Sequence, residues 1–223
     1  MHFHLPKPPH GWNVVVWDLA IVTLGVLIAL VAQQLADDIH RRNEVTQLVG
    51  ALRGELADDR ARWEHIRASD PCTLQRLDAL ERWNEMAPAD AKLKRAYRLF
   101  LWNMHSGAWD LAKTSESTAN IPLRERLTFA SLYDAINNWR QFINEENGNA
   151  QALGGLLATA DQPENRRQIA YHISLARGFV GRRQFNYDYM FTRFDALRIA
   201  PDQSQMTVKP NDRLLCEPLD RLD

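Results

Sequence analysis

The chain has 223 residues, a length that fits one domain, or a domain with an anchor, and allows a sizeable core to be buried. Hydrophobic residues make up 45% of it and charged residues 25%, proportions typical of a folded chain. With 27 basic and 28 acidic residues, the formal net charge is -1. Such a balance gives no global field that would attract nucleic acid or steer an acidic substrate, so we expect no nucleic-acid partner.

The first element in chain order is an apolar run from Val14 to Ala32, in which Asp18 is the only charged residue. As a helix, this run would span about 28 Å, close to the hydrocarbon thickness of a bilayer. It continues into charged sequence rather than into the small residues of a signal-peptide cleavage site. We therefore predict a short tail over 1–12 and an uncleaved transmembrane helix over 13–35, with the lipid bilayer as a partner.

Three residues of this helix are candidate contacts with another membrane helix. Asp18 lies near the interface that Trp12 and Trp17 mark. Its carboxylate either benefits from the positive end of the helix dipole or pairs with a cation on a neighbouring transmembrane helix. Gly25 and Ala29 place two small residues four positions apart, a spacing that permits close helix association. We expect the neighbour to be another inner-membrane protein or a second copy of this chain.

The orientation of the helix rests on opposing signals. Lys7 precedes the apolar run, whereas Arg41, Arg42 and Arg53 follow it, and basic residues alone would retain the large domain in the cytoplasm. A short amino-terminal tail before a large domain is, however, the usual signal-anchor arrangement, and long domains translocate largely regardless of charge. We predict a single-pass protein of a bacterial inner membrane with most of its chain in the periplasm.

Beyond the apolar run, hydrophobic residues recur at intervals of three and four, with charged residues between them. No alternating run of strand length competes with this pattern. We therefore predict an all-α fold, in which the transmembrane helix continues into a helical bundle of about five elements over 36–200. Residues 201–223 are expected to form a polar tail that docks on the bundle.

Turn signals divide the predicted bundle into helices. The first helix is expected to end at about residue 68, because Asp70 and Pro71 match the N-cap and first residue of a second helix, which would end near "MAP". A third helix is expected from "APAD" to about Met104, and "SGAWDLAKTSESTAN" is expected to be a broken helix or a loop.

Two further helices follow in the second half of the chain. One opens near Pro122 and is expected to weaken at Gly148 and at the pair Gly154-Gly155, because glycine is a poor helix former. The last begins after "DQP", where proline suits the first helical position. Its aromatic side chains are interpreted mainly as core residues, with the lining of a ligand cavity as the alternative: Phe179, Phe185, Tyr187, Tyr189, Phe191 and Phe194.

Residue patterns for metal binding and catalysis are weak. The tail histidines His2, His4 and His10 lack acidic partners, and the remaining candidates fall on separate segments without the Glu-x-x-His pairs of di-metal bundles: His65, His105 and His172. Glycine-rich phosphate motifs, G-x-S-x-G and H-E-x-x-H are missing from the sequence. We therefore predict no catalytic, cofactor-binding or metal-binding residues, and hence a protein that is not an enzyme.

Two local clusters qualify this prediction. Glu55, Asp58 and Asp59 are interpreted as a solvated helix face with Arg60 and Arg62 as local partners. A membrane-anchored hydrolase would need a nucleophile and a base that meet in space, and the serines near His105 are the place to inspect for it: Ser106, Ser115 and Ser117.

The stretch "WDLAIVTLGVLIALVAQQLADDIHRRNEVTQLVGALRGELADD" resembles the opening of an uncharacterised family of bacterial single-span, membrane-anchored helical proteins. In that family an acidic residue precedes a "GVLIAL"-type helix, and Asp18 matches that position. The segments "PCTLQRLDAL", "AWDLAKTS" and "LLCEPL" are similar to later landmarks of the family. The resemblance implies an architecture only, because the family provides no catalytic residues to transfer.

Two functional hypotheses follow. The leading one is a non-enzymatic structural or accessory subunit of an inner-membrane assembly, which packs against another component or against itself. The alternative is a periplasmic helical bundle that senses or binds a ligand. The alternative predicts a sizeable cavity between the helices with converging polar groups, whereas a solidly packed bundle would count against it.

Cys72 and Cys216 are the only cysteines in the chain. An even count in a protein expected to lie partly outside the cytoplasm favours a disulfide, with two unrelated buried thiols as the alternative. Cys216 lies in "LLCEPL", an apolar island in a polar tail. A bond to Cys72 would explain how Leu214 and Leu215 stay docked on the bundle.

Overall fold

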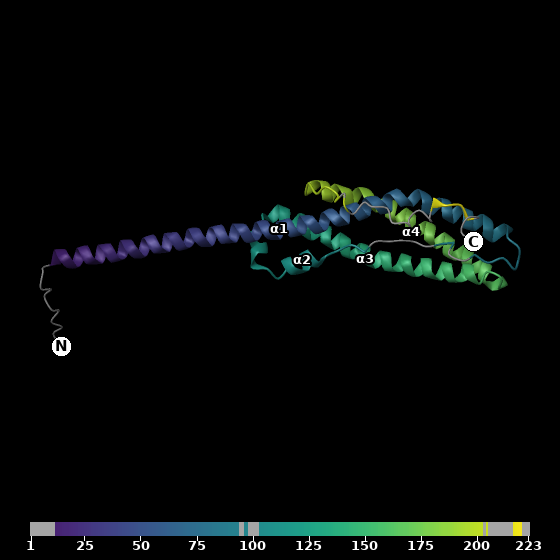
Figure 1. Ribbon diagram of the computed structural model, residues 1–223, viewed down its shortest axis with the longest axis horizontal. Helices are drawn as coiled ribbons and strands as arrows, with labels where there is room; N and C mark the ends of the chain where they lie inside the picture. Colours follow the sequence, from purple (N-terminus) through teal and green to yellow (C-terminus); the bar gives the residue numbers. More distant parts are fainter. Residues whose placement is uncertain (1–11, 94–95, 98–102, 203, 205–215, 220–223) are drawn as a thin grey trace, which may run out of the picture. The chain divides into compact units, whose positions relative to one another are not determined.

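The computed structural model describes residues 12–93, 96–97, 103–202, 204 and 216–219 (Figure 1). Its helices are α1 (Trp12–Met86), α2 (Gly107–Ala112), the short 3-10 helix η1 (Glu116–Asn120), α3 (Leu123–Ala158) and α4 (Pro163–Ala196). No strand occurs in these ranges, which confirms the predicted all-α fold. The chain divides into two compact units, Met1–Gln47 and Leu48–Asp223.

The described part of the first unit is the amino-terminal portion of α1. Every side chain from Asn13 to Glu44 in it is exposed, including the large apolar residues of the predicted span. In a soluble domain such a continuous apolar surface would be covered by other elements. Within the described residues, α1 is the one helix that is long and apolar enough to cross a membrane.

α1 does not end where the sequence predicts. It passes through Pro71 and continues to Met86, so the expected second helix is part of the first. Proline removes one helical hydrogen bond and costs about 3 kcal/mol inside a helix. Tertiary packing offsets that cost, because the turns on both sides of Pro71 are buried against the bundle at Ile66 and Leu77.

The predicted third helix is also wrong in its described residues. Between Met86 and Gly107 these residues carry no helix, although Leu93, Tyr97 and Met104 are buried. The Leu93 N–H instead donates a hydrogen bond of 3.0 Å to the Leu157 carbonyl at the end of α3. The segment thus buries its apolar residues without forming a helix in its described positions.

The second half of the chain is more regular than its glycines suggest. α3 runs without a break through Gly148 and the Gly154-Gly155 pair, which contradicts the predicted weakening. Each glycine costs about 1 kcal/mol relative to alanine, and burial of Leu153 and Leu157 in the same turns outweighs it. α4 begins at Pro163, as predicted.

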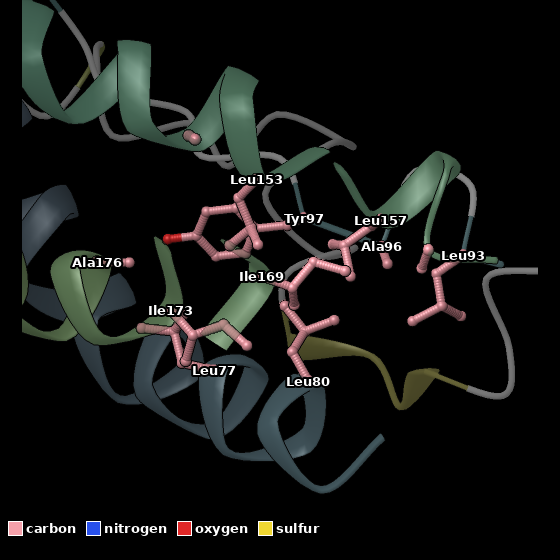
Figure 2. Packing of buried hydrophobic residues seen from close by; sticks show 12 residues of the cluster. Leu77, Leu80, Leu93, Ala96, Tyr97, Leu153, Leu157, Ile169, Ile173 and Ala176 are labelled. Atoms are coloured by element: carbon pink, nitrogen blue, oxygen red, sulfur yellow. The ribbon is translucent and has the colours of Figure 1, made fainter. Parts of the chain in front are cut away.

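The core of the second unit brings together α1, the segment after it, α3 and α4, and Figure 2 shows these side chains facing one another. Its members include Leu77 and Leu80 of α1, Leu153 of α3 and Ile173 of α4. Leu219 packs against the same cluster. The described segment that contains Leu219 is therefore part of the folded unit.

A disulfide also secures the carboxyl-terminal segment. Cys72 and Cys216 are joined, with their Cα atoms 4.8 Å apart, inside the range that a disulfide requires. Next to the bond, the Arg76 guanidinium donates to the Glu217 carbonyl. The expected docking of Leu214 and Leu215 lies outside the described residues.

One buried arginine connects three helices of the second unit. Arg183 of α4 is fully buried and pairs with Asp70 of α1, at 2.7 Å, and with Glu146 of α3. The Tyr187 hydroxyl donates to the second oxygen of Asp70, also at 2.7 Å. Asp70 therefore serves as an interior acceptor rather than as the predicted N-cap.

Candidate functional site

The main candidate site is a half-open cleft of about 580 Å³ in the second unit. This volume lies within the range of about 300–1,000 Å³ that small-molecule sites occupy. We name it the α3–α4 cleft. Its lining residues are Trp63 of α1; Leu127, Ala130, Ser131, Asp134, Ala135, Asn138, Trp139 and Phe142 of α3; and Arg182, Asn186, Tyr189 and Met190 of α4.

Helices α3 and α4 form the two walls of the cleft, and short side chains on α3 leave the space between them. α3 and α4 form a helical hairpin, because residues 159–162 alone connect them. Along the α3 wall, Ala130, Ser131 and Ala135 carry short side chains, which leave space that larger residues would fill. The exposed ring of Tyr189 borders that space on the α4 wall.

Aromatic rings form the floor of the cleft. The ring centroids of Trp63 and Trp139 lie 4.2 Å apart, and those of Trp139 and Phe142 lie 4.9 Å apart. Trp63 also meets Tyr187 edge-on at 5.6 Å. The floor residues come from α1 and α3, and Tyr187 of α4 supports Trp63 from outside the lining of the cleft, so the floor depends on the packing of three helices.

Two charged side chains line the cleft. Arg182 lies with its Cζ 4.8 Å from the centroid of the Phe142 ring, and in the described part of the chain its guanidinium has no carboxylate partner. Asp134 lies on the α3 wall and is exposed. The Asn186 amide donates to the Arg182 carbonyl at 2.7 Å. The cleft thus joins an apolar floor to polar groups near its opening.

Two donors in the cleft are unsatisfied. The indole Nε1 atoms of Trp63 and Trp139 are buried, and neither has a hydrogen-bond partner among the described residues. A buried donor without a partner costs about 1–3 kcal/mol. The two donors lie on neighbouring rings of the cleft floor, where an acceptor that enters the cleft could satisfy them.

A second polar cluster holds α2 against α1. The Glu55 carboxylate accepts hydrogen bonds from the Ala108 N–H, at 2.9 Å, and from the Tyr133 hydroxyl, also at 2.9 Å. Asp59 is fully buried and accepts the His105 N–H at 3.0 Å. The predicted solvated face is therefore wrong for Glu55 and Asp59, because both satisfy backbone donors before or within the first turn of α2.

Burial dominates the electrostatics of this cluster. It raises the pKa of Asp59 to about 7, although the His105 N–H and the Arg62 guanidinium, 3.5 Å away, act in the opposite direction. Burial also lowers the pKa of His105, and Arg62 adds to that effect. Burial therefore favours the uncharged form of both Asp59 and His105.

The hydrolase hypothesis finds little support at Ser106. Its hydroxyl donates to Asp110 at 3.2 Å and accepts from Arg140 at 3.1 Å. The ring of the adjacent His105 instead faces Arg62, with its Nε2 3.0 Å from the guanidinium. The serine beside His105 in sequence is thus not paired with that ring.

The other candidate ligands are dispersed. His172 Nδ1 lies 2.7 Å from the Asn149 side-chain oxygen, whereas His2, His4 and His10 lie outside the described residues. No group of three metal-ligating side chains comes together within the described ranges.

The predicted membrane-helix contacts are all on the surface of the first unit. Asp18, Gly25 and Ala29 are exposed, and a Cβ placed on Gly25 would meet no atom within 4 Å. The face is therefore open to lipid or to another helix. Its association with a partner stays a prediction.

Comparisons with models of known protein families, with curated proteins and with solved structures find no match for this chain. The resemblance to the family of membrane-anchored helical proteins therefore stays a prediction.

Sequence reasoning missed most of the α3–α4 cleft. The alternative that α4 aromatics line a cavity applies to Tyr189, which lies in the cleft, whereas Phe194 is core and Phe185 is exposed. Trp63, Trp139 and Arg182 gave no signal, because nothing in the sequence indicates that three such distant positions converge.

Proposed function

We propose that this chain is a non-enzymatic protein of a bacterial inner membrane, anchored by a single span, whose periplasmic helical bundle binds a small organic molecule in the α3–α4 cleft. The observation that carries the proposal is the cleft itself, which combines an aromatic floor, polar groups near the opening and unsatisfied donors. Ligand sites are typically concave and mostly apolar with a few placed polar groups. This was the feature expected of a ligand-binding bundle and not of a solidly packed one.

The anchor in this proposal is the apolar part of α1. Its exposed side chains support a lipid environment, because hydrocarbon is the surrounding that such a surface favours. The disulfide supports the periplasmic placement, since disulfides persist in oxidising compartments.

A cleft-filling variant tests ligand binding. Ala135 lines the cleft, and Ala135→Trp should fill it; Ala152→Trp, on an exposed position of the same helix, is the matched control. Full-length protein in detergent micelles is screened by thermal unfolding against small organic molecules of varied charge and ring content. A ligand at 100 times its Kd stabilises by about 2.7 kcal/mol.

We expect at least one class of compound to raise the Tm of the wild type and of Ala152→Trp, but not that of Ala135→Trp. If every compound acts alike on all three proteins, the cleft is not a binding site and the proposal fails.

A second candidate function is the accessory subunit of an inner-membrane assembly, which the open face at Gly25 and Ala29 favours. It is compatible with ligand binding, because the two roles use different units. The double substitution Gly25→Leu with Ala29→Leu should block close helix approach, whereas Val31→Leu changes another face. Co-purification from native membranes in mild detergent should lose a partner, or a second copy, in the double variant alone. A wild-type protein that is monomeric and unaccompanied would exclude this role.

A further inference from the structure

The polar groups of the α3–α4 cleft specify the kind of molecule that fits it. An indole N–H is a donor only, so a ligand group that pairs with Trp139 Nε1 must be an acceptor. Trp139 keeps 5% of its surface exposed, whereas Trp63 is fully buried. The Nε1 atom of Trp139 is itself buried, so a ligand has to reach the floor of the cleft to accept a hydrogen bond from it.

The charged side chain near Trp139 and Phe142 is the guanidinium of Arg182. Both Arg182 and Trp139 contact the Phe142 ring, at 4.8 Å and 4.9 Å, so the guanidinium and the indole lie around one ring. Arginine without a carboxylate partner presents a planar fork of donors that matches a carboxylate. The unsatisfied donor and the unpaired cation thus call for the same chemical group.

Asp134 is the acidic side chain that opposes this charge. It precedes Phe142 by two helical turns on α3, which places its backbone about 12 Å away along the helix axis. Its position on α3 is therefore about two turns from the Phe142 ring that the Arg182 guanidinium contacts. A cationic ligand would need to bind at the Asp134 end and would leave the Trp139 donor unsatisfied.

We propose that the α3–α4 cleft takes a planar aromatic carboxylate, whose ring lies along the apolar wall and whose carboxylate accepts hydrogen bonds from Trp139 Nε1–H and the Arg182 guanidinium. This inference rests on the proposed ligand-binding function and narrows it to a ligand class. The cleft volume of about 580 Å³ leaves room for more than one ring.

A matched series of probes tests the ligand class: 2-naphthoate, 2-naphthalenemethanol and 2-naphthylmethylammonium share one ring system and differ in charge. Full-length protein with ¹⁵N-labelled tryptophan is titrated in detergent micelles, and the indole N–H signals are followed by NMR. Trp139→Phe and Trp63→Phe, which keep a ring and remove the donor, assign the two signals. Empty micelles correct for partition of the probes.

We expect naphthoate to shift the Trp139 indole proton downfield and to bind about tenfold or more tightly than the alcohol or the ammonium, because charge-assisted hydrogen bonds are the stronger kind. Arg182→Gln should remove most of that preference while leaving the affinity for the alcohol nearly unchanged. Arg167→Gln, an exposed arginine on the same helix, is the control and should leave both affinities unchanged.

Other outcomes overturn the inference in distinguishable ways. If the alcohol binds as tightly as naphthoate, or the ammonium more tightly at Asp134, the ligand class is wrong and the binding function stands. Naphthoate binding that leaves the Trp139 signal in place assigns the anion to another site. If none of the three probes binds while the cleft-dependent screen gives hits, the aromatic carboxylate is excluded; if both experiments are empty, the proposed function falls as well.

Discussion

At the scale of single residues, the interior of this bundle uses charge to fix contacts between helices. Arg183 faces two carboxylates, and burial raises the pKa of Glu146 while the guanidinium opposes that rise. A buried pair of this kind adds little net stability against apolar residues of the same shape, but the loss of one partner is costly. Because the three charges come from α1, α3 and α4, the loss of any one of them would leave an unpaired charge between these helices.

The buried carboxyl group of Asp59 is expected to make the free energy of unfolding depend on pH. Its pKa is raised from the ordinary value of 3.8 to about 7, so between these values the native state binds a proton that the unfolded chain releases. The contribution of Asp59 to stability is therefore full below about pH 4, is lost progressively as the pH rises to about 7, and then stays constant. The loss is at most about 4 kcal/mol over this window, at 1.36 kcal/mol for each unit of pKa shift.

Asp59→Asn should flatten this dependence, because an amide oxygen still accepts the His105 N–H and does not titrate. The measurement is the free energy of unfolding in urea at intervals from pH 4 to pH 8. Asp188→Asn removes an exposed carboxylate that does not act on Asp59 and is the control that should keep the slope. Parallel curves for the wild type and Asp59→Asn would refute the assignment.

At the scale of elements, the sequence predicts the helical class and the last helix, but it misplaces several boundaries. The periodicity that indicates helices is a local property, and the all-α fold follows from it. Pro71 and the glycines of α3 are local signals too, yet both are overridden by burial of the turns around them. The segment after Met86 shows the converse, since its apolar residues are buried without forming a helix in the described positions.

The site was harder to predict than the fold for a related reason. Trp63, Trp139 and Arg182 meet because three helices pack in one register, and register is set by the whole core rather than by any spacing in the sequence. The disulfide was easier, because two cysteines allow only one pairing.

Pro71 is expected to lower the stability of α1. Since it is exposed inside α1 and leaves a carbonyl without its helical donor, Pro71→Ala should stabilise the protein by about 1–2 kcal/mol after the entropy that proline removes from the unfolded chain is subtracted. Pro163→Ala, at the favoured first position of α4, should be neutral or slightly destabilising. Urea unfolding of both variants, followed by tryptophan fluorescence, gives the comparison. A destabilised Pro71→Ala protein would mean that the native helix needs proline there.

At the scale of the whole molecule, two units with different surfaces share one chain. The first exposes a continuous apolar helix, and the second buries its apolar residues in a core that extends to Leu219 near the end of the chain. A lipid environment suits the former and water the latter. The disulfide belongs to the second unit, so its redox state reports the compartment in which that unit resides.

The bond between Cys72 and Cys216 closes a loop with a sequence separation of 144 residues. In the chain-entropy model such a closure stabilises the native state by at most about 5 kcal/mol, so the double substitution Cys72→Ser with Cys216→Ser should lower the free energy of unfolding by about 2–5 kcal/mol. It should also make residues 216–219 more accessible to proteolysis, because the docking of Leu219 and Glu217 then depends on non-covalent contacts alone. Alkylation in intact cells with a thiol reagent that cannot cross the inner membrane tests the compartment. The wild type should stay unlabelled until it is denatured and reduced, whereas Cys72→Ser should be labelled at once at the exposed Cys216. If only a membrane-permeant reagent labels the wild type, without reduction, the thiols are free in the cytoplasm, and the disulfide and the periplasmic orientation are excluded together.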